Sequence, residues 1–350
     1  MKKRYKILIS LAGLTILMTM FFTACQNRKT EGTEGDLSAA VKALLYTTDT
    51  GNQSQIMWWN DEWQVIGTSR YAFSGASLDG FKNASVSDGK LILVPRGEAQ
   101  ERDYGKIVLI DTSDGTYETI DIGRINPTSF DVERNMVAVT SNLNMECFID
   151  VADITTKSVQ SMSLNDYGLC VTDVVLVNGE VYGVAVRNDL ESSLLCHIDV
   201  HNQICEEIMP LSDDSPFLGK HGDDVVLTSH DKMIRYNTKS KEYTEQTLTR
   251  NDAFNINICG DVILIAYTNI HDREYDSLVE ARDYATNTVI GEMSQPGAIL
   301  QLESDGELMY VLGYDKLYQY RMQAGKFTLI KSISCETNGY YLGGFYHFGK

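Results

Sequence analysis

The sequence predicts an all-β protein, a seven-bladed β-propeller, and three observations carry this prediction. From Val41 onward, short apolar runs rich in Val and Ile alternate with Asp, Asn and Gly, and almost no helical periodicity occurs. Two kinds of turn recur along the chain at a common period of about 43 residues. Strand-like segments that belong to neither series remain at both ends of this region, and together they supply one further blade.

The first recurring turn is a polar pair followed at once by an apolar strand. It precedes the segments KLILV, MVAV, EVYGVAV, DVVLT, VILIA and ELMYVL, and its marker residues are Gly89, Asn135, Gly179, Asp223, Asp261 and Gly306. One step along this series is about 43 residues, which is the length of a four-stranded propeller blade. The series therefore predicts six complete blades.

The second recurring turn joins two strands further along each unit and usually begins with an acidic or amide residue. Its first residues are Asp111, Asp153, Asp199, Asn237, Asp283 and Arg321. An Asp or Asn side chain at this position accepts hydrogen bonds from backbone N–H groups two residues on, which favours a tight turn. Arg321 offers no acceptor, so we expect the backbone alone to hold the last turn of the series.

The seventh blade is predicted from the two ends of the folded region. Residues 41–82 precede the first complete blade and contain three strand-like runs, and the tail after Cys335 contains another at residues 340–342. Pairing the two ends closes the ring and leaves no open sheet edge. We therefore place the propeller domain at residues 41–350, with its closing blade split between the N- and C-terminal segments.

Two segments, SDGKLIL and LIDTSDGTYETI, resemble the repeats of bacterial propellers of the YVTN type and of the pyrroloquinoline-quinone type. They are also similar to the C-terminal propeller of the periplasmic Tol-Pal component. The resemblance implies an architecture and no particular ligand, because its motifs are turn chemistry. The quinone repeats carry a recurring Trp that this chain lacks, so we expect no cofactor. The three Trp present, Trp58, Trp59 and Trp63, are predicted to pack the closing blade, with a platform for sugar stacking as the alternative.

The first 25 residues have the features of an export signal. A basic start without acidic residues precedes an apolar run from Ile7 to Phe22, which is short for a membrane span. The run ends in Phe-Thr-Ala-Cys, which resembles the lipobox of bacterial lipoproteins, although Phe22 stands where Leu is usual. The resemblance implies a signal peptide at residues 1–24, lipidation (palmitate) of Cys25, and anchoring to the outer face of the cell membrane. An ordinary cleaved signal and an uncleaved anchor are the alternatives.

The net charge of −18 limits the class of partner. Such an acidic chain is repelled by nucleic-acid phosphates and by anionic membrane surfaces, so we expect neither to bind the folded part. Residues 25–40 are predicted to be a flexible tether between the lipid and the propeller, because polar side chains dominate their first part. We expect a monomer whose partner is an envelope protein or a glycan.

Residues that could perform catalysis or bind a metal form no recognisable set. Four of the six His fall beside a hairpin turn or in loops of different blades, and none is expected on an inner strand with a second His in register. No HExxH, GxSxG or P-loop motif occurs either. The Cys residues after Cys25 match no metal-binding spacing, and Cys196 with Cys205 is the first candidate pair for a disulfide. We therefore expect no metal site and a non-enzymatic binding or scaffolding function. A polysaccharide hydrolase or lyase with its site at the central pore is the alternative.

Three long polar connections, each between the second and third strands of a blade, form the candidate binding face. Because antiparallel strands alternate in direction, these connections open on one face and the Asp-headed turns lie on the other. Arginine side chains in these connections could bind an anionic sugar or a carboxylate through two parallel hydrogen bonds, or could merely pair with acidic neighbours. The candidate residues are Arg96, Glu101, Arg102, Arg187, Asp189, Asp272, Arg273 and Glu274.

Overall fold

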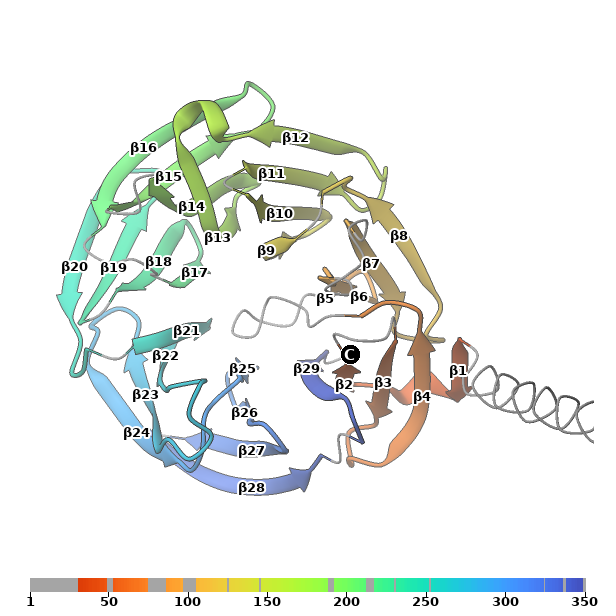
Figure 1. Cartoon of the computed structure of the whole chain (residues 1–350). Coiled ribbons are helices and arrows are strands. Elements are labelled where there is room, and N and C mark those ends of the chain that lie inside the picture. The colour runs from red at the N-terminus through yellow and green to blue at the C-terminus, as the bar shows by residue number, and fades with distance from the viewer. Residues whose placement is uncertain are drawn as a thin grey trace, which may run out of the picture.

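The structure is a computed structural model, and it describes most of the chain from residue 31 onward. The described residues are 31–48, 53–74, 86–96, 105–124, 126–144, 146–187, 192–211, 217–229, 231–251, 253–323, 325–335 and 338–348. Within them the strands form seven antiparallel sheets, six with four strands and one with five. The sheets are arranged around a central axis as the blades of a propeller (Figure 1), so the predicted fold class is confirmed. In these same ranges, no helix has the length and apolar character needed to cross a membrane.

The blades follow one another along the chain. Blade 1 contains β1 (Gly32–Gly35), β2 (Lys42–Thr47), β3 (Ser54–Trp59), β4 (Val65–Tyr71) and β29 (Tyr341–His347). Blade 2 contains β5 (Val86–Ser87), β6 (Lys90–Leu93), β7 (Lys106–Asp111) and β8 (Tyr117–Asp121). Blade 3 contains β9 (Pro127–Glu133), β10 (Met136–Leu143), β11 (Glu146–Asp153) and β12 (Val159–Ser163). Blade 4 contains β13 (Leu169–Val177), β14 (Glu180–Arg187), β15 (Ser193–Asp199) and β16 (Ile204–Leu211).

The last three blades have the same arrangement. Blade 5 contains β17 (Phe217–His221), β18 (Asp224–Ser229), β19 (Lys232–Asn237) and β20 (Tyr243–Thr247). Blade 6 contains β21 (Ala253–Cys259), β22 (Val262–Tyr267), β23 (Ser277–Asp283) and β24 (Val289–Gln295). Blade 7 contains β25 (Gln301–Ser304), β26 (Leu308–Leu312), β27 (Lys316–Gln323) and β28 (Lys326–Ser334). Two short 3-10 helices, η1 (Leu37–Ala39) and η2 (Asn165–Tyr167), lie between strands.

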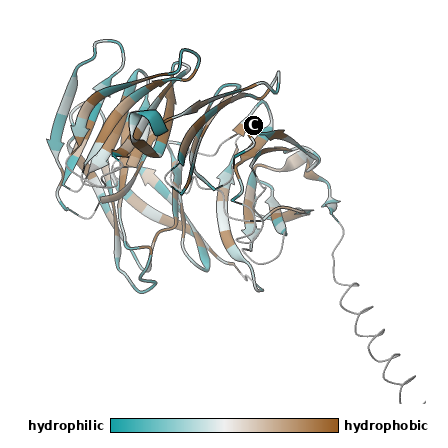
Figure 2. Ribbon diagram, turned by 45° about the horizontal axis from the view of Figure 1, so that its top comes forward, coloured by the Kyte–Doolittle hydropathy of each residue, from teal (hydrophilic) through white to brown (hydrophobic). Residues whose placement is uncertain are grey.

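In blades 2 to 7 the chain starts at the axis and moves outward through four strands, here called A to D (Figure 1). Because neighbouring strands are antiparallel, the A–B and C–D turns lie at one end of every blade. The B–C connections and the D–A connections between blades lie at the other end. We call these two ends the turn face and the loop face. Figure 2 shows hydrophobic residues along the strands and hydrophilic ones at the turns.

The two predicted series of turns occupy the turn face. In the A–B turn of blade 4, Asn178 and Gly179 have φ of 56° and 81°, the left-handed values of a two-residue hairpin turn. In the C–D turn of blade 3, Oδ1 of Asp153 accepts hydrogen bonds from the backbone N–H groups of Thr155 and Thr156, both at 2.8 Å. These contacts are the ones that the turn chemistry predicts.

The last turn of the second series differs from the expectation. Arg321 lies inside β27 and not at the head of a turn, because the pairing of β27 with β28 continues until Gln323 stands opposite Lys326. Gly325, at φ 74°, allows the chain to reverse immediately after this pair. The predicted period therefore holds in blade 7, but β27 and β28 pair further than expected, and the turn that joins them is shorter than the predicted one.

Blade 1 combines strands from both ends of the folded region, as predicted. Its order is β1-β4-β3-β2-β29, so the C-terminal strand is the innermost one. Leu44 of β2 pairs with Phe345 of β29. The ring of Trp63 stacks on that of Phe345 with a centroid distance of 6.1 Å, and its Nε1 donates to Oε1 of Gln319 in blade 7 at 3.2 Å. This arrangement agrees with a packing role for the tryptophans of this blade.

Residues 31–40 differ from the expected tether. Strand β1 pairs with β4 along the outer edge of blade 1, and Arg70 of β4 forms an ion pair with Glu34 at 2.7 Å. Leu37 and Ala40 are buried in the hydrophobic core of this blade. These two apolar side chains supply the burial that a free tether lacks, so this part of the chain belongs to the propeller.

The cysteines in the described residues are all free thiols. The predicted first candidate pair, Cys196 and Cys205, lies on neighbouring strands, but Cys205 stands opposite Ile198 and Cys196 stands opposite Glu207. The two cysteines are therefore diagonal neighbours, whose Cα atoms are typically about 7–8 Å apart. Their side chains nevertheless reach each other in a hydrogen bond between the two thiols, and both remain free cysteines in this structure.

Candidate functional site

Five of the predicted binding residues belong to described segments, and all five lie on the loop face. Arg96 follows β6, Arg187 ends β14, and Asp272, Arg273 and Glu274 lie in the B–C connection of blade 6. The other predicted positions, Cys25, Glu101, Arg102 and Asp189, fall outside the described residues. Strand alternation thus brings B–C connections from three different blades to the same face, as expected.

A cavity of about 730 Å³ opens on this face. Its walls come from the B–C connections of blades 6 and 7 and from the D–A connections that enter β25 and β29. Arg96 of blade 2 and Arg273 of blade 6 both line it. A cavity that touches blades 6, 7, 1 and 2 lies toward the axis, since that is where successive blades converge.

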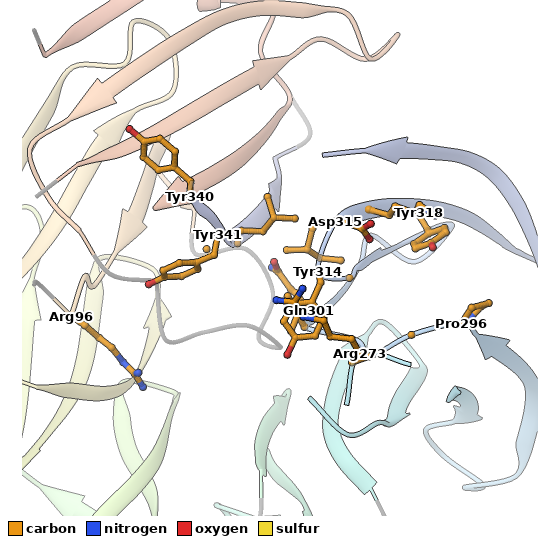
Figure 3. Close-up of a pocket in the computed structure, with 18 residues that line it drawn as sticks. Arg96, Arg273, Pro296, Gln301, Tyr314, Asp315, Tyr318, Tyr340 and Tyr341 are labelled. Carbon is orange, nitrogen blue, oxygen red and sulfur yellow. The ribbon is translucent and has the colours of Figure 1, made fainter. Parts of the chain in front are cut away.

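The two arginines stand apart within the cavity. Figure 3 shows Arg96 on one side and Arg273, with Tyr314 and Gln301, on the other, while Tyr341 lies between them in this view. Both arginines are exposed, and neither forms an ion pair among the described residues. In a chain of net charge −18, these two arginines line the cavity without an ion pair to any carboxylate that the structure describes.

Arg273 is positioned by contacts between blades 6 and 7. Its guanidinium lies over the ring of Tyr314, 4.5 Å from the ring centroid, and the Tyr314 hydroxyl donates to the carbonyl oxygen of Ile270. The turn that carries Arg273 is held by Asp272, whose Oδ1 accepts from the N–H of Glu274 at 3.0 Å. Cation–π contact and turn together hold the guanidinium at the cavity wall.

The cavity also contains tyrosines from the connection into β29. Tyr340 and Tyr341 are half-buried, and the Tyr340 hydroxyl donates to Oε1 of Gln53 at 3.2 Å. Gln301 lines the same cavity, but it is buried and both ends of its amide are occupied by the backbone of Phe345. Gln301 therefore holds the wall in place, whereas the tyrosine rings form part of the surface.

The structure separates Arg187 from the other two arginines. Its guanidinium forms an ion pair with Glu207 of the same blade, Nη2 to Oε2, at 2.7 Å. It does not line the cavity. An exposed pair of this kind contributes little to stability, about 1 kcal/mol at most, and leaves no free guanidinium for a ligand. Asp272 and Glu274 likewise serve the turn beside Arg273.

Sequence reasoning missed the tyrosines. Tyr314 lies in a short B–C connection, and Tyr340 and Tyr341 lie before and at the start of a strand, so length and charge did not mark them. The alternation of strand direction could have indicated them, because it places the B–C and the D–A connections on the same face. In the described residues, no group of three or more His, Cys, Asp or Glu side chains is arranged to hold a metal ion.

Comparisons with known proteins support the architecture. No family model matches the sequence, and no curated protein matches it either. Among solved structures, a Bacteroides fragilis protein provisionally assigned as a 6-phosphogluconolactonase is similar, with a TM-score of 0.61 and 12% identity over 89% of this chain and 98% of the other. AztD from Citrobacter koseri is similar with a TM-score of 0.54 and 9% identity, over 89% of this chain and 98% of the other. TolB from Acinetobacter baumannii is similar with a TM-score of 0.50 and 12% identity, over 88% of this chain and 82% of the other. At these identities the similarity shows the propeller fold alone.

Proposed function

We propose that the protein is a non-enzymatic binding module of the cell envelope, anchored by a lipid on Cys25 and displaying its loop face to a ligand or protein partner. The observation that carries the proposal is the cavity on the loop face, which Arg96 and Arg273 line from two distant B–C connections. Specific binding sites occur mainly on loops held by a rigid scaffold, and a closed propeller is such a scaffold.

The chemistry of the cavity favours binding over hydrolysis. Glycoside hydrolysis normally needs two carboxyl groups that flank the scissile bond. Asp315 is the one carboxylate among the described residues that line the cavity. TolB and AztD are among the solved propellers that are similar to this chain. The similarity is one of fold, so it is compatible with a scaffold role and does not indicate a ligand.

The test is a capture experiment with the full chain, purified in detergent and immobilised, against an envelope extract. We expect at least one envelope component to be retained by the wild type and lost from the double variant Arg96→Ser/Arg273→Ser. Arg187→Ser is the matched control, because Arg187 lies on the same face but outside the cavity. Equal retention by all three proteins would show that binding, if any, uses another surface.

A further inference from the structure

We infer that the cavity of the loop face binds a short oligosaccharide that carries uronic-acid carboxylates; this inference rests on the proposed binding function and names its ligand. The cavity combines two arginines that form no ion pair with a carboxylate of the described segments, half-buried tyrosine rings and a volume of about 730 Å³. Each of these three features fits one part of an acidic sugar.

The arginines fit the carboxylate. A guanidinium presents a planar pair of N–H donors that matches a carboxylate, and this match is stronger when the arginine is held in place beforehand. The guanidinium of Arg273 is held 4.5 Å from the ring centroid of Tyr314, and the residue is exposed at the cavity wall. Arg96 reaches the same cavity from blade 2, so two separate carboxylates along one chain can be bound at once.

The tyrosines fit the sugar rings. A pyranose has an apolar C–H face and a rim of hydroxyl groups, and tyrosine offers a flat apolar ring with a polar hydroxyl at its edge. Tyr314, Tyr340 and Tyr341 surround the cavity, and hydrogen bonds hold the hydroxyls of Tyr314 and Tyr340. Aromatic rings held in this way lose little conformational entropy on binding.

The volume and the walls distinguish this ligand from other anions. The cavity lies within the range of about 300–1,000 Å³ that is usual for small-molecule sites, which is far more than a single inorganic anion needs. The walls combine connections between strands with residues of the innermost strands β25 and β29. Leu312 and Leu342 are buried and Leu300 is half-buried, so tyrosine rings and charged side chains make up much of the exposed wall.

The experiment is isothermal titration of the full chain in detergent with trigalacturonic acid. The matched probe is the same trisaccharide with its carboxyl groups reduced to primary alcohols. We expect the acidic trisaccharide to bind and the reduced one to bind about tenfold more weakly or not at all. Arg96→Ser and Arg273→Ser should each weaken binding of the acidic sugar by about tenfold or more, because each removes a charge-assisted hydrogen-bonding group. Arg187→Ser should bind as the wild type does, and thermal melting of every variant should match the wild type.

The other outcomes show whether the ligand assignment is wrong, or the proposed binding function as well. Equal binding of the acidic and the reduced sugar would overturn the assignment of the carboxylate. Binding of hexaglutamate in place of the sugar would overturn the ligand class in favour of an acidic peptide. If no sugar binds but the double variant still loses an envelope component in the capture experiment, the uronate inference is wrong and the proposed function stands. If the capture experiment also fails to depend on Arg96 and Arg273, both proposals fall.

Discussion

Blade 1 and blade 3 are held together in different ways. In blade 3 every strand continues into the next through a hairpin or a short connection, and turn residues such as Asp153 set the register locally. In blade 1 the innermost strand β29 meets β2 through hydrogen bonds and packing alone, because the two strands come from opposite ends of the folded region. Closure therefore depends on contacts that no local turn provides.

The contacts between innermost strands show the same contrast. At the junction of blades 4 and 5, Oδ2 of Asp173 accepts one hydrogen bond from the N–H of Leu218 at 2.9 Å. At the junction of blades 7 and 1, the amide of Gln301 binds both the N–H and the carbonyl oxygen of Phe345, each at 2.6 Å. At this junction a single side chain thus binds both backbone groups of one residue on the innermost strand.

Removing β29 should have the largest effect. Deletion of residues 337–350 takes the innermost strand from blade 1 and opens the ring, so we expect a loss of several kcal/mol, comparable with a total domain stability of about 5–15 kcal/mol. Thermal melting followed by circular dichroism measures this. Deletion of residues 31–35 is the control, since it removes the outermost strand β1 of the same blade. An equal effect of both deletions would contradict the importance of closure.

Replacing Gln301 should have the next largest effect. Gln301→Met keeps most of the side-chain volume but leaves two buried backbone groups of Phe345 without partners. A buried group left unpaired costs about 1–3 kcal/mol, so we expect a loss of about 2–4 kcal/mol in urea unfolding. Asp173→Leu at the continuous junction leaves one backbone group, the N–H of Leu218, without this partner. It also removes the acceptor of the Ser129 hydroxyl, which can reorient, so we expect a smaller loss than for Gln301→Met. The reverse order would show that closure places no special demand on Gln301.

Asp150 in blade 3 should respond to pH. Burial raises the pKa of its carboxyl to about 6, although a hydrogen bond from Ser161 and the charge of Arg124 lower it. Because the folded pKa lies above the unfolded one, the fold is favoured below about pH 4 and penalised as Asp150 ionises toward pH 6. Asp150→Asn should therefore stabilise by about 1–3 kcal/mol at pH 8 and by nothing at pH 3.5. A gain that did not depend on pH would rule out ionisation as its cause.

The contribution of Asp153 to stability should depend on pH in the opposite direction from that of Asp150, and more weakly. The backbone N–H of Thr156, together with other hydrogen bonds in the turn, lowers the pKa of this exposed carboxyl. Its contribution is present above the unfolded pKa near 4 and is lost as the pH falls through the folded value. We expect Asp153→Ala to lower the melting temperature slightly at pH 7, with no difference from the wild type at pH 2. A difference that persisted in acid would point to packing instead.

Cys25→Ala should leave the melting temperature unchanged, because the predicted lipid lies outside the propeller. The variant should lose labelling by an alkyne fatty acid and either leave the membrane fraction or remain an uncleaved precursor. Click detection on a gel and cell fractionation measure both effects. Labelling that survives the substitution would refute the lipobox assignment.

Most of the fold could be predicted because turn chemistry is local. The turn hydrogen bonds of Asp153 and the left-handed φ of Asn178 are set within a few residues, so the regular recurrence of each kind of turn reports the blade period directly. Arg321 shows the limit, since the turn there moved when cross-strand pairing extended β27 to Gln323. Leu37 shows another limit, because its burial depends on the packing surface that blade 1 offers, and the local sequence does not reveal that surface.

The candidate site was predictable in part. Arg96 and Arg273 were found because alternating strands send every B–C connection to one face, which is a rule of connectivity. Arg187 satisfied the same rule, yet its guanidinium meets Glu207 two strands away. Tyr314 joined the site through contacts with Ile270 and Arg273 of the neighbouring blade, and no sequence pattern connects these residues.

The sequence by itself determined the class of fold, the number of blades, the split closing blade and the face to which each connection belongs. These properties follow from hydrophobic periodicity and turn chemistry, which act over a few residues. Only the tertiary structure decided which arginines remain without an acidic partner, which tyrosines line a cavity, and how Gln301 fastens the last strand. Those properties depend on the distance and orientation between blades, and side chains that are distant in sequence meet only when the ring has closed.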